Sequence, residues 1–160
     1  LEEIDLRRIL EEVSSLANPD AAQHSVTIER DLPEEPLMVK ADSDFMKQAF
    51  LNVVLNGVQA MPDGGRLSIS SRREDDVVVT EVRDQGQGIP PEIQEKLFEL
   101  YFTTKKGGSG IGLAQTYQVM QWHYGTVEFE SAAGRGTTFR LRMPLASPRP
   151  DTAEELATHP

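Results

Sequence analysis

Two pairs of strand-like segments, one on each side of a glycine-rich stretch, constrain the fold more than any other feature of this sequence. The first pair is Arg66–Arg72 and Val77–Arg83, and the second is Gly125–Ser131 and Thr137–Met143. Each pair is rich in residues that favour strands and is joined by a short run of turn residues, which is the pattern of a β-hairpin. We therefore expect two hairpins that contribute to one largely antiparallel sheet.

Helical spacing of apolar residues marks much of the remaining chain. Helices are expected from Asp5 to about Ala22, from Asp42 or Ser43 to about Met61, over Pro91–Phe98, and from Gly110 to about His123; short strands are expected at Ser25–Arg30 and near Leu37–Lys40. This order does not repeat the strand–helix–strand unit of a parallel sheet. It predicts an α+β fold, a two-layer α/β sandwich with a mixed, mostly antiparallel sheet covered on one face by helices.

Composition narrows the range of functions. The 160-residue chain has a formal net charge of −10 and no cysteine, which excludes disulfides, zinc–thiolate sites and thiol nucleophiles. An acidic surface argues against a general nucleic-acid binder, because such proteins need a basic face. A nucleotide ligand is still compatible with this charge, since backbone N–H groups, a metal ion and one or two lysines can hold phosphates locally.

The long central helix carries two asparagines. Asn52 and Asn56 are four residues apart, so their amides lie on one face of the helix. A buried amide needs a partner, and Mg²⁺, which takes oxygen ligands, is one such partner. Two satisfied asparagines packed under a loop are the alternative. Gly57 follows directly, and a glycine in a helix interior, which costs roughly 1 kcal/mol relative to alanine, often marks close approach by another group.

A strand of β-branched residues leads directly into Asp84, Gly86 and Gly88. An ionised carboxylate only accepts hydrogen bonds, so Asp84 could receive the exocyclic amino group of adenine. The two glycines would allow close approach of the base and positive φ angles. A strand that simply ends in a turn is the alternative, because aspartate and glycine are common turn residues.

A third element, Gly107–Leu113, opens the last helix. Amides at a helix N-terminus, made accessible by glycines, form a phosphate cradle; a flexible linker is the alternative. The glycine spacing matches neither the Walker nor the dinucleotide pattern. Just before it, Leu97–Lys106 joins aromatic residues to two lysines, as expected of a lid that packs when nucleotide binds. Lys105 or Lys106 could reach a terminal phosphate, and a solvated lysine pair is the alternative.

In this order and spacing, the elements resemble the catalytic domain of sensor histidine kinases, in the superfamily shared with DNA gyrase, the heat-shock ATPase chaperones and MutL. Asn52 and Asn56 resemble the N box, Asp84–Gly88 the G1 box, Phe98–Phe102 the F box, and Gly108–Gly112 the G2 box. The likeness extends from about Asp5 to Pro144. The run Leu51–Gly65 is most similar to the nitrogen-regulation-type kinases.

The resemblance implies a Bergerat-type fold that binds ATP and Mg²⁺. Asn56 would ligate Mg²⁺, Asn52 would support phosphate and metal, and Asp84 would bind adenine, with Thr137 helping through water. Asn52 and Lys105 are the implied catalytic residues, Lys105 as a γ-phosphate contact. The implied nucleotide-binding residues are Asn52, Asn56, Asp84, Gly86, Gly88, Ile89, Phe102, Thr103, Lys105, Gly108, Ser109, Gly110, Ile111, Gly112, Leu113 and Thr137.

The residue at position 52 bears on the reaction. Gyrase-like and MutL-like members have a glutamate where Asn52 stands, and an asparagine amide cannot act as a general base near neutral pH. The resemblance therefore implies transfer of the γ-phosphoryl group to a histidine rather than rapid hydrolysis. A hydrolysing ATPase of the same superfamily, and a non-catalytic nucleotide-sensing or interaction module, are the alternative functions.

The acceptor histidine is expected on a separate dimerisation domain, because His24, His123 and His159 lack its setting. His123 and Tyr124 instead resemble the start of the family's His-Gly-Gly element, with Tyr124 departing from it. A response regulator is the expected downstream partner, whereas nucleic acid and direct membrane contact are not expected. The isolated domain is expected to be a monomer and its parent a homodimer.

The chain is expected to be an excised, cytoplasmic piece of a larger protein, since it starts at Leu1, lacks a signal peptide and has no apolar run near the roughly 18 residues that span a membrane. The parent could itself be membrane-anchored. Residues 1–22 are expected to be an N-terminal helix and the remnant of a link to the dimerisation domain. Residues 23–146 are expected to be the ATP-binding domain, and residues 147–160 a disordered tail.

Overall fold

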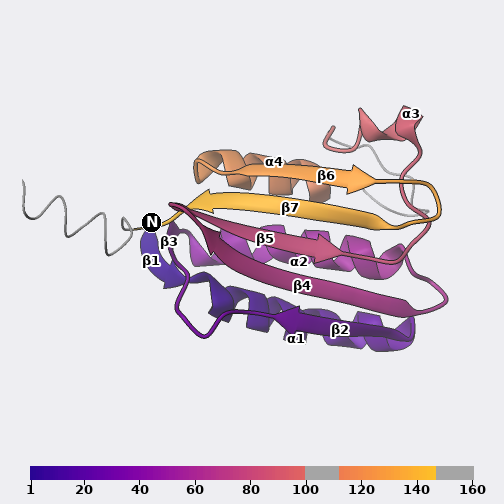
Figure 1. Ribbon diagram of the computed structural model, residues 1–160, viewed down its shortest axis with the longest axis horizontal. Helices are drawn as coiled ribbons and strands as arrows, with labels where there is room; N and C mark the ends of the chain where they lie inside the picture. The colour runs from indigo at the N-terminus through magenta and orange to yellow at the C-terminus, as the bar shows by residue number, and fades with distance from the viewer. Residues whose placement is uncertain (100–111, 147–160) are drawn as a thin grey trace, which may run out of the picture.

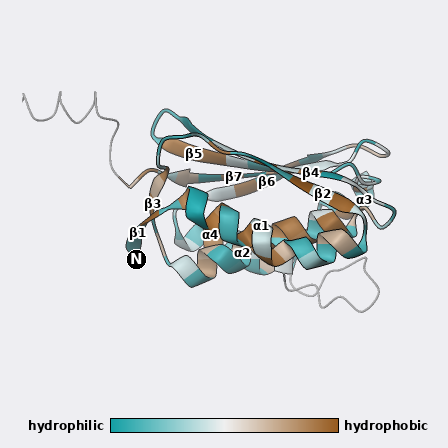
Figure 2. Ribbon diagram, turned by 90° about the horizontal axis from the view of Figure 1, so that it is seen from below, coloured by the Kyte–Doolittle hydropathy of each residue, from teal (hydrophilic) through white to brown (hydrophobic). Residues whose placement is uncertain are grey.

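The structure is a computed structural model that describes residues 1–99 and 112–146. This part of the chain forms two layers (Figure 1). A five-stranded sheet forms one layer, and three helices lie against one of its faces (Figure 2). The strands of this sheet are β2 (Val26–Asp31), β4 (Gly65–Glu74), β5 (Val77–Arg83), β6 (Thr126–Ser131) and β7 (Thr137–Pro144). The three helices are α1 (Leu6–Gln23), α2 (Ser43–Gln59) and α4 (Gly112–Trp122). The predicted two-layer α+β sandwich is confirmed.

The sheet has the strand order β2-β4-β5-β7-β6. Its neighbours pair antiparallel except β2 and β4, which are parallel. Parallel strands need a crossover connection, and α2 lies between β2 and β4 in the chain. A two-residue turn joins β4 to β5, and Asp75 in it adopts a φ of 53°, which suits a tight hairpin. The predicted mixed, mostly antiparallel sheet is therefore confirmed.

A second, two-stranded sheet lies beside the N-terminus of α1. It pairs β1 (Glu2–Asp5) antiparallel with β3 (Met38–Ala41). The sequence pattern did not predict β1, because Ile4 is the one apolar residue in the strand and alternation cannot be recognised from a single position. A short helix, α3 (Pro91–Gln94), follows the first hairpin. None of the helices in the described residues is long and apolar enough to cross a lipid bilayer.

The core lies between the helices and the inner face of the sheet. Leu6, Leu10 and Val13 of α1 are fully buried and belong to the same cluster as Phe50 of α2 and Ile69 of β4. Burial of such side chains is the main favourable term in folding. Helix α1 is therefore packed into one unit with the residues after it. Its proposed role as the remnant of a link to a dimerisation domain stays a prediction.

His123 joins the end of α4 to the start of α2. Its ring is buried, Nδ1 lies 2.7 Å from the carbonyl oxygen of Val119, and Nε2 accepts a hydrogen bond of 3.0 Å from the backbone N–H of Asp42. A carbonyl only accepts and a backbone N–H only donates, so the neutral imidazole with its hydrogen on Nδ1 satisfies both partners. His123 is therefore a structural residue, as expected from its position at a helix end.

Tyr124 ends α4 in the left-handed conformation, with a φ of 60°. The Tyr124 N–H donates to the carbonyl of Gln121, and the Gly125 N–H donates to that of Met120. These two bonds form a Schellman motif, whose left-handed residue is usually glycine. The family element that His123 and Tyr124 resemble has glycine there, so the structure gives a backbone reason for that glycine and identifies Tyr124 as a strained substitute.

We predict that Tyr124→Gly raises the free energy of unfolding by about 0.5–1 kcal/mol. The left-handed conformation costs a non-glycine residue roughly 1–2 kcal/mol, and the greater freedom of glycine in the unfolded chain offsets part of that gain. The Tyr124 side chain is 85% exposed, so little packing is lost. Urea denaturation measures the effect. Tyr124→Ala is the matched control, because it removes the same ring but keeps Cβ; an equal stability change in both variants would contradict the strain argument.

Candidate functional site

Asp84 occupies the position directly after β5, at the end of the sheet where β7 begins (Figure 1). It is 4% exposed. Its backbone N–H donates to the carbonyl of Thr137 at 2.9 Å, which continues the pairing of β5 with β7. Its carboxylate Oδ1 accepts hydrogen bonds from the backbone N–H groups of Gly86 (2.9 Å) and Thr137 (3.2 Å). Strand β7 and the segment that follows β5 therefore fix the orientation of this carboxylate.

Burial raises the pKa of Asp84 above its ordinary value, and the hydrogen bonds from Gly86 and Thr137 oppose that rise. Both of those bonds end on Oδ1, and no hydrogen bond from another described residue reaches Oδ2. A buried carboxylate oxygen of this kind has capacity to accept a hydrogen bond from a ligand. The site therefore offers one fixed acceptor, which suits a donor group such as an exocyclic amine.

Gly57 of α2 faces this carboxylate. A Cβ atom placed on Gly57 would lie 3.6 Å from Cβ and 3.8 Å from Oδ2 of Asp84, and it would overlap the side chain of Leu67. The helix therefore approaches the sheet closely at the point where Asp84 is held. This is the close approach that the glycine within the helix predicts.

Gly86 and Gly88 shape the segment after Asp84. A Cβ on Gly86 would lie 2.6 Å from the carbonyl oxygen of Ala60, and one on Gly88 would collide with the backbone of Ala132. Gly88 has a φ of +81°, which confirms the positive φ predicted there, whereas Gly86 does not have a positive φ, so the same prediction was wrong for Gly86. The nearest atom to such a Cβ is a backbone carbonyl oxygen at both glycines. Their contact with a nucleotide base stays a prediction.

Ser131 organises a hydrogen-bond network that the sequence did not reveal. Its Oγ accepts from the N–H of Ile89 at 2.6 Å and lies 2.9 Å from Oγ1 of Thr137. Gln94 donates from Nε2 to the carbonyl of Ile89 at 2.8 Å. These bonds place Ile89 and Thr137, both predicted site residues, beside one another. Ser131 ends a strand, where serine is too common for its identity to indicate such a role.

Asn52 projects from α2 onto the start of α4. Its Nδ2 donates to the carbonyl of Gly112 (3.2 Å), and its Oδ1 accepts from Gln48 Nε2 (3.1 Å). Thr116 is fully buried, and its Oγ1 lies 3.0 Å from the carbonyl oxygens of both Ala49 and Gly112, which share its single O–H hydrogen. The N-terminal turn of α4 is therefore attached to the middle of α2. Gln48, four residues before Asn52 on the same helix face, is a signal that sequence reasoning did not use.

Asn56 lies on α2 between Asn52 and Gly57 and is half-buried. Within residues 1–99 and 112–146, no three His, Cys, Asp or Glu side chains gather as a metal site. A site made only of protein carboxylates, histidines and cysteines is thus not found in this part of the chain. Mg²⁺ bound with a nucleotide needs no such cluster, because phosphates and water supply most of its ligands. The amide oxygen of Asn56 fits that donor set.

The described residues bring part of the predicted site together. Asn52 contacts Gly112, the first residue of the helix that also carries Leu113, while Asp84, Ile89 and Thr137 are joined by hydrogen bonds at the end of the sheet. Other predicted site residues lie outside the described residues, namely Phe102, Thr103, Lys105, Gly108, Ser109, Gly110 and Ile111. His159 and the expected tail, residues 147–160, lie outside them as well.

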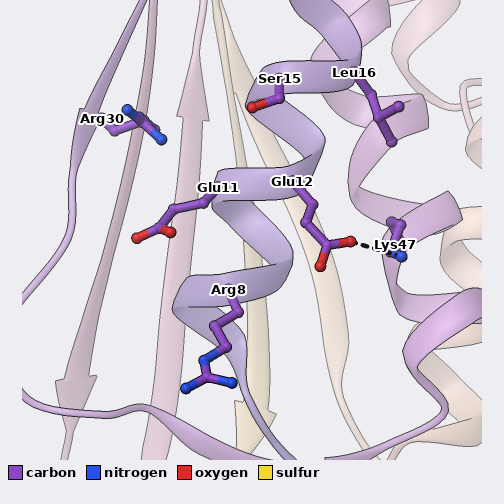
Figure 3. Close-up of a pocket in the computed structure, with 7 residues that line it drawn as sticks. All are labelled: Arg8, Glu11, Glu12, Ser15, Leu16, Arg30 and Lys47. Carbon is purple, nitrogen blue, oxygen red and sulfur yellow. Dashed lines mark ion pairs between the residues drawn. The ribbon is translucent and has the colours of Figure 1, made fainter.

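A surface hollow over α1 is a different feature (Figure 3). Its side chains come from α1, β2 and α2, and two of them, Glu12 and Lys47, form an ion pair of 2.7 Å. The others, Arg8, Glu11, Ser15, Leu16 and Arg30, point in different directions around the helix. The hollow is lined by side chains of both charges that do not converge on one point, so it shows no arrangement suited to a specific ligand. We therefore place the functional site at the Asp84 end of the sheet.

Comparison with known proteins identifies the family. The sequence pattern of the family described as "Histidine kinase-, DNA gyrase B-, and HSP90-like ATPase" matches residues 41–147. That match covers more than half of the chain. The chain therefore belongs to this family of ATPase domains, and its relatives within the family are sensor histidine kinases.

Three relatives illustrate the likeness. Sporulation kinase C of Bacillus subtilis (strain 168) is 34% identical over 143 residues, covering 89% of this chain and 33% of that protein. The catalytic domain of histidine kinase ThkA is 29% identical with a TM-score of 0.81, covering 90% of this chain and 97% of that one. Full-length ShkA in complex with AMPPNP is 26% identical with a TM-score of 0.82, covering 94% of this chain and 32% of that one.

These comparisons confirm the histidine-kinase resemblance and the fold of the catalytic domain, and they support ATP as the nucleotide. The chain spans only a fifth to a third of the length of the sporulation kinases, 20% of sporulation kinase E and 34% of sporulation kinase B. The nitrogen-regulation subtype stays a prediction, as does each residue's role at the site.

We predict that Asp84→Asn stabilises the nucleotide-free protein at neutral pH relative to the parent. Burial raises the native pKa of Asp84. At pH values between the pKa of the unfolded chain and the native pKa, the native state therefore holds a proton that the unfolded chain has released. The stability that this proton provides is present at low pH and is lost as the pH rises through the native pKa. Asparagine keeps an oxygen that accepts the Gly86 and Thr137 hydrogen bonds and has no such penalty.

The measurement is urea denaturation of both proteins at several pH values from about 4 to about 8. The stability of Asp84→Asn minus that of the parent should increase with pH. Asp63→Asn, at an exposed aspartate, is the control and should show no such trend. A difference between Asp84→Asn and the parent that is independent of pH would contradict the assignment of a raised native pKa.

Proposed function

We propose that this chain binds Mg²⁺–ATP at the Asp84 end of the sheet and presents the γ-phosphoryl group to a histidine on a separate domain. The observation that carries the proposal is the fixed carboxylate of Asp84. Its Oδ1 is held by the Gly86 and Thr137 N–H groups, while Oδ2 faces Gly57 and accepts no hydrogen bond from another described residue. An acceptor placed in this way suits the exocyclic amino group of adenine.

Individual residues would then have distinct roles. Asp84 would accept from adenine, with Thr137 assisting through a water molecule, and Gly86 and Gly88 would shape the base pocket. Asn56 would ligate Mg²⁺, and Asn52 would support the phosphates and the metal. The remaining proposed nucleotide contacts are Ile89, Phe102, Thr103, Lys105, Gly108, Ser109, Gly110, Ile111, Gly112 and Leu113, with Lys105 at the γ-phosphate. Mg²⁺ would neutralise charge on the transferring phosphoryl group.

We propose transfer rather than hydrolysis, with the acceptor on another domain. Asn52 cannot remove a proton from water near neutral pH. In addition, the histidines in the described residues have structural partners: His123 uses both ring nitrogens, and Nδ1 of His24 lies 2.9 Å from the carbonyl oxygen of Asp20. Neither is placed as an acceptor for the γ-phosphoryl group. We therefore propose an acceptor on a domain outside residues 1–99 and 112–146.

The proposal extends to the parent protein. Since the chain spans a third or less of the length of several sensor kinases, we propose that residues 23–146 act with a histidine-bearing dimerisation domain linked through residues 1–22. The parent would be a cytoplasmic or membrane-anchored homodimer, and a response regulator would receive the phosphoryl group. The isolated chain would be a monomer that contacts neither nucleic acid nor a membrane.

The first test of this function is calorimetry with ATP and Mg²⁺, followed by measurement of phosphate release over hours. We expect binding by the parent and very slow release. In Asp84→Asn, loss of the acceptor to adenine should weaken binding by about 1–3 kcal/mol, or roughly 5- to 150-fold. The pH-dependent stability of this variant serves as the control for folding. Unchanged affinity would contradict the placement of adenine at Asp84.

Supplying the dimerisation domain of a related sensor kinase in trans, with [γ-³²P]ATP, then tests the reaction. We expect label on the histidine of that domain and none on this chain. Steady phosphate release without acceptor would instead mean that water is activated despite Asn52, and would favour the hydrolysing ATPase. Binding with neither release nor transfer would favour a non-catalytic nucleotide-sensing module.

A further prediction concerns the metal. Asn56→Ala should reduce the dependence of ATP affinity on Mg²⁺, because one oxygen ligand of the ion is lost. Calorimetric titration with ATP, with Mg²⁺ and with EDTA, measures this dependence. The matched control is Gln59→Ala, one turn further along α2 at an exposed position. Equal Mg²⁺ dependence in Asn56→Ala and the parent would remove Asn56 from the metal.

A further inference from the structure

The outer face of the main sheet, which Figure 1 views directly, is not covered by the helices. Its side chains form rows, because the strands pair in register. One row, read from β2 to β6, is Glu29, Ser68, Arg83, Thr138 and Glu130, and the next row away from the Asp84 end is Asp31, Ser70, Glu81, Arg140 and Glu128. Alternation along a strand sends neighbouring residues to opposite faces. Arg83 and Thr138 therefore lie outside while Asp84 and Thr137 lie inside.

The arginines on this face divide into two groups. Four are paired with glutamates: Arg66 with Glu29, Arg72 with Glu74 and Glu81, Arg140 with Glu81, Glu128 and Glu130, and Arg142 with Glu128. Arg83 and Arg135 have no acidic partner within the part of the chain that the structure describes. Two exposed guanidinium groups that no described carboxylate pairs with are notable in a chain whose formal net charge is −10.

Arg83 lies between two hollows in this face. One is lined by Ser68, Ser70, Glu81 and Arg83. The other is lined by Arg83, Arg135, Thr138, Ser131, Gly136 and neighbouring residues, including Glu130. Short side chains (serine, threonine and glycine) leave the room that larger ones would fill. The positive charge is therefore placed beside space for a small ligand.

Hydrogen-bond donors dominate around Arg83. Its Nε donates to Oγ1 of Thr138 at 3.2 Å, so this oxygen acts as acceptor and its own O–H hydrogen is available to a ligand. The guanidinium keeps its two terminal nitrogens, and the hydroxyls of Ser68 and Ser70 line the adjoining hollow. The bordering carboxylates are neutralised, since Glu81 pairs with Arg72 and Arg140, and Glu130 pairs with Arg140. Of the charged side chains that line the two hollows, Arg83 and Arg135 are therefore the ones without an ion pair to another described residue.

We propose that the hollows around Arg83 form a second binding site, on the face of the sheet opposite Asp84, for a small ligand that carries a phosphate-type oxyanion. One guanidinium group can donate two parallel hydrogen bonds to two oxygens of the same phosphate. In the hollow lined by Arg83, Arg135 and Thr138, two guanidinium groups and a hydroxyl offer more donors than the two oxygens of a carboxylate would use, and they suit the three or four oxygens of a phosphate. The site does not depend on the proposed kinase function.

The test uses inorganic phosphate as the probe and the ¹⁵N-labelled chain without nucleotide, at constant ionic strength. We expect saturable shifts of the backbone amides of Arg83, Arg135, Gly136 and Thr138, with weaker binding of acetate. Arg83→Gln should lower phosphate affinity roughly tenfold, since it removes a charge-assisted bidentate contact. Arg66→Gln is the matched control, because it removes the same charge from the same face at a residue already paired with Glu29.

Three outcomes would overturn the proposal. Shifts that do not saturate would mean that phosphate does not occupy a defined site. Equal weakening in Arg83→Gln and Arg66→Gln would mean that only the general charge of the face matters. Equal affinity for acetate and phosphate would remove the preference for phosphate. Phosphate bound at the nucleotide side would shift Gly112 and Leu113 instead, so failure here and failure of the proposed ATP site are distinguishable.

Discussion

The pairing of β5 with β7 at Asp84 and Thr137 is the interaction on which the arrangement of the site depends. The backbone N–H of Asp84 donates to Thr137, and the N–H of Thr137 donates back to the Asp84 carboxylate. A buried carboxylate is costly unless hydrogen bonds satisfy it. Here the sheet itself supplies those bonds, so the orientation of the side chain is set by the same contacts that hold the two hairpins together.

Helix α2 connects this pairing to the rest of the molecule. Gly57 lets the helix approach Asp84, and Asn52, earlier on the same helix, contacts the first turn of α4. His123 fixes the other end of α4 against the start of α2. The base-pocket side and the phosphate side of the proposed site are thus positioned by one helix. A change of packing under α2 would move both sides together.

Much of the fold could be predicted from the sequence because its signals are local. The hairpins, the helical spacing of α1 and α2, and the glycine pattern can each be recognised in a short stretch of sequence. Among the predicted site residues, the structure places Asp84 in contact with Thr137 and Asn52 in contact with Gly112. What could not be predicted depends on tertiary pairing. β1 forms only because β3 pairs with it. Ser131 hydrogen-bonds to both Ile89 and Thr137, which belong to separate segments of the chain.

Strand parity has a consequence for how this sequence can vary. Arg83 and Asp84 are adjacent in the chain but face opposite sides of the sheet, as do Thr138 and Thr137. Inserting or deleting one residue within β5 or β7 would exchange the two faces beyond that point and direct a guanidinium toward the interior while moving the carboxylate into solvent. Length changes in these strands should therefore be tolerated only in the turns, or as bulges that restore the alternation before the strand reaches Asp84.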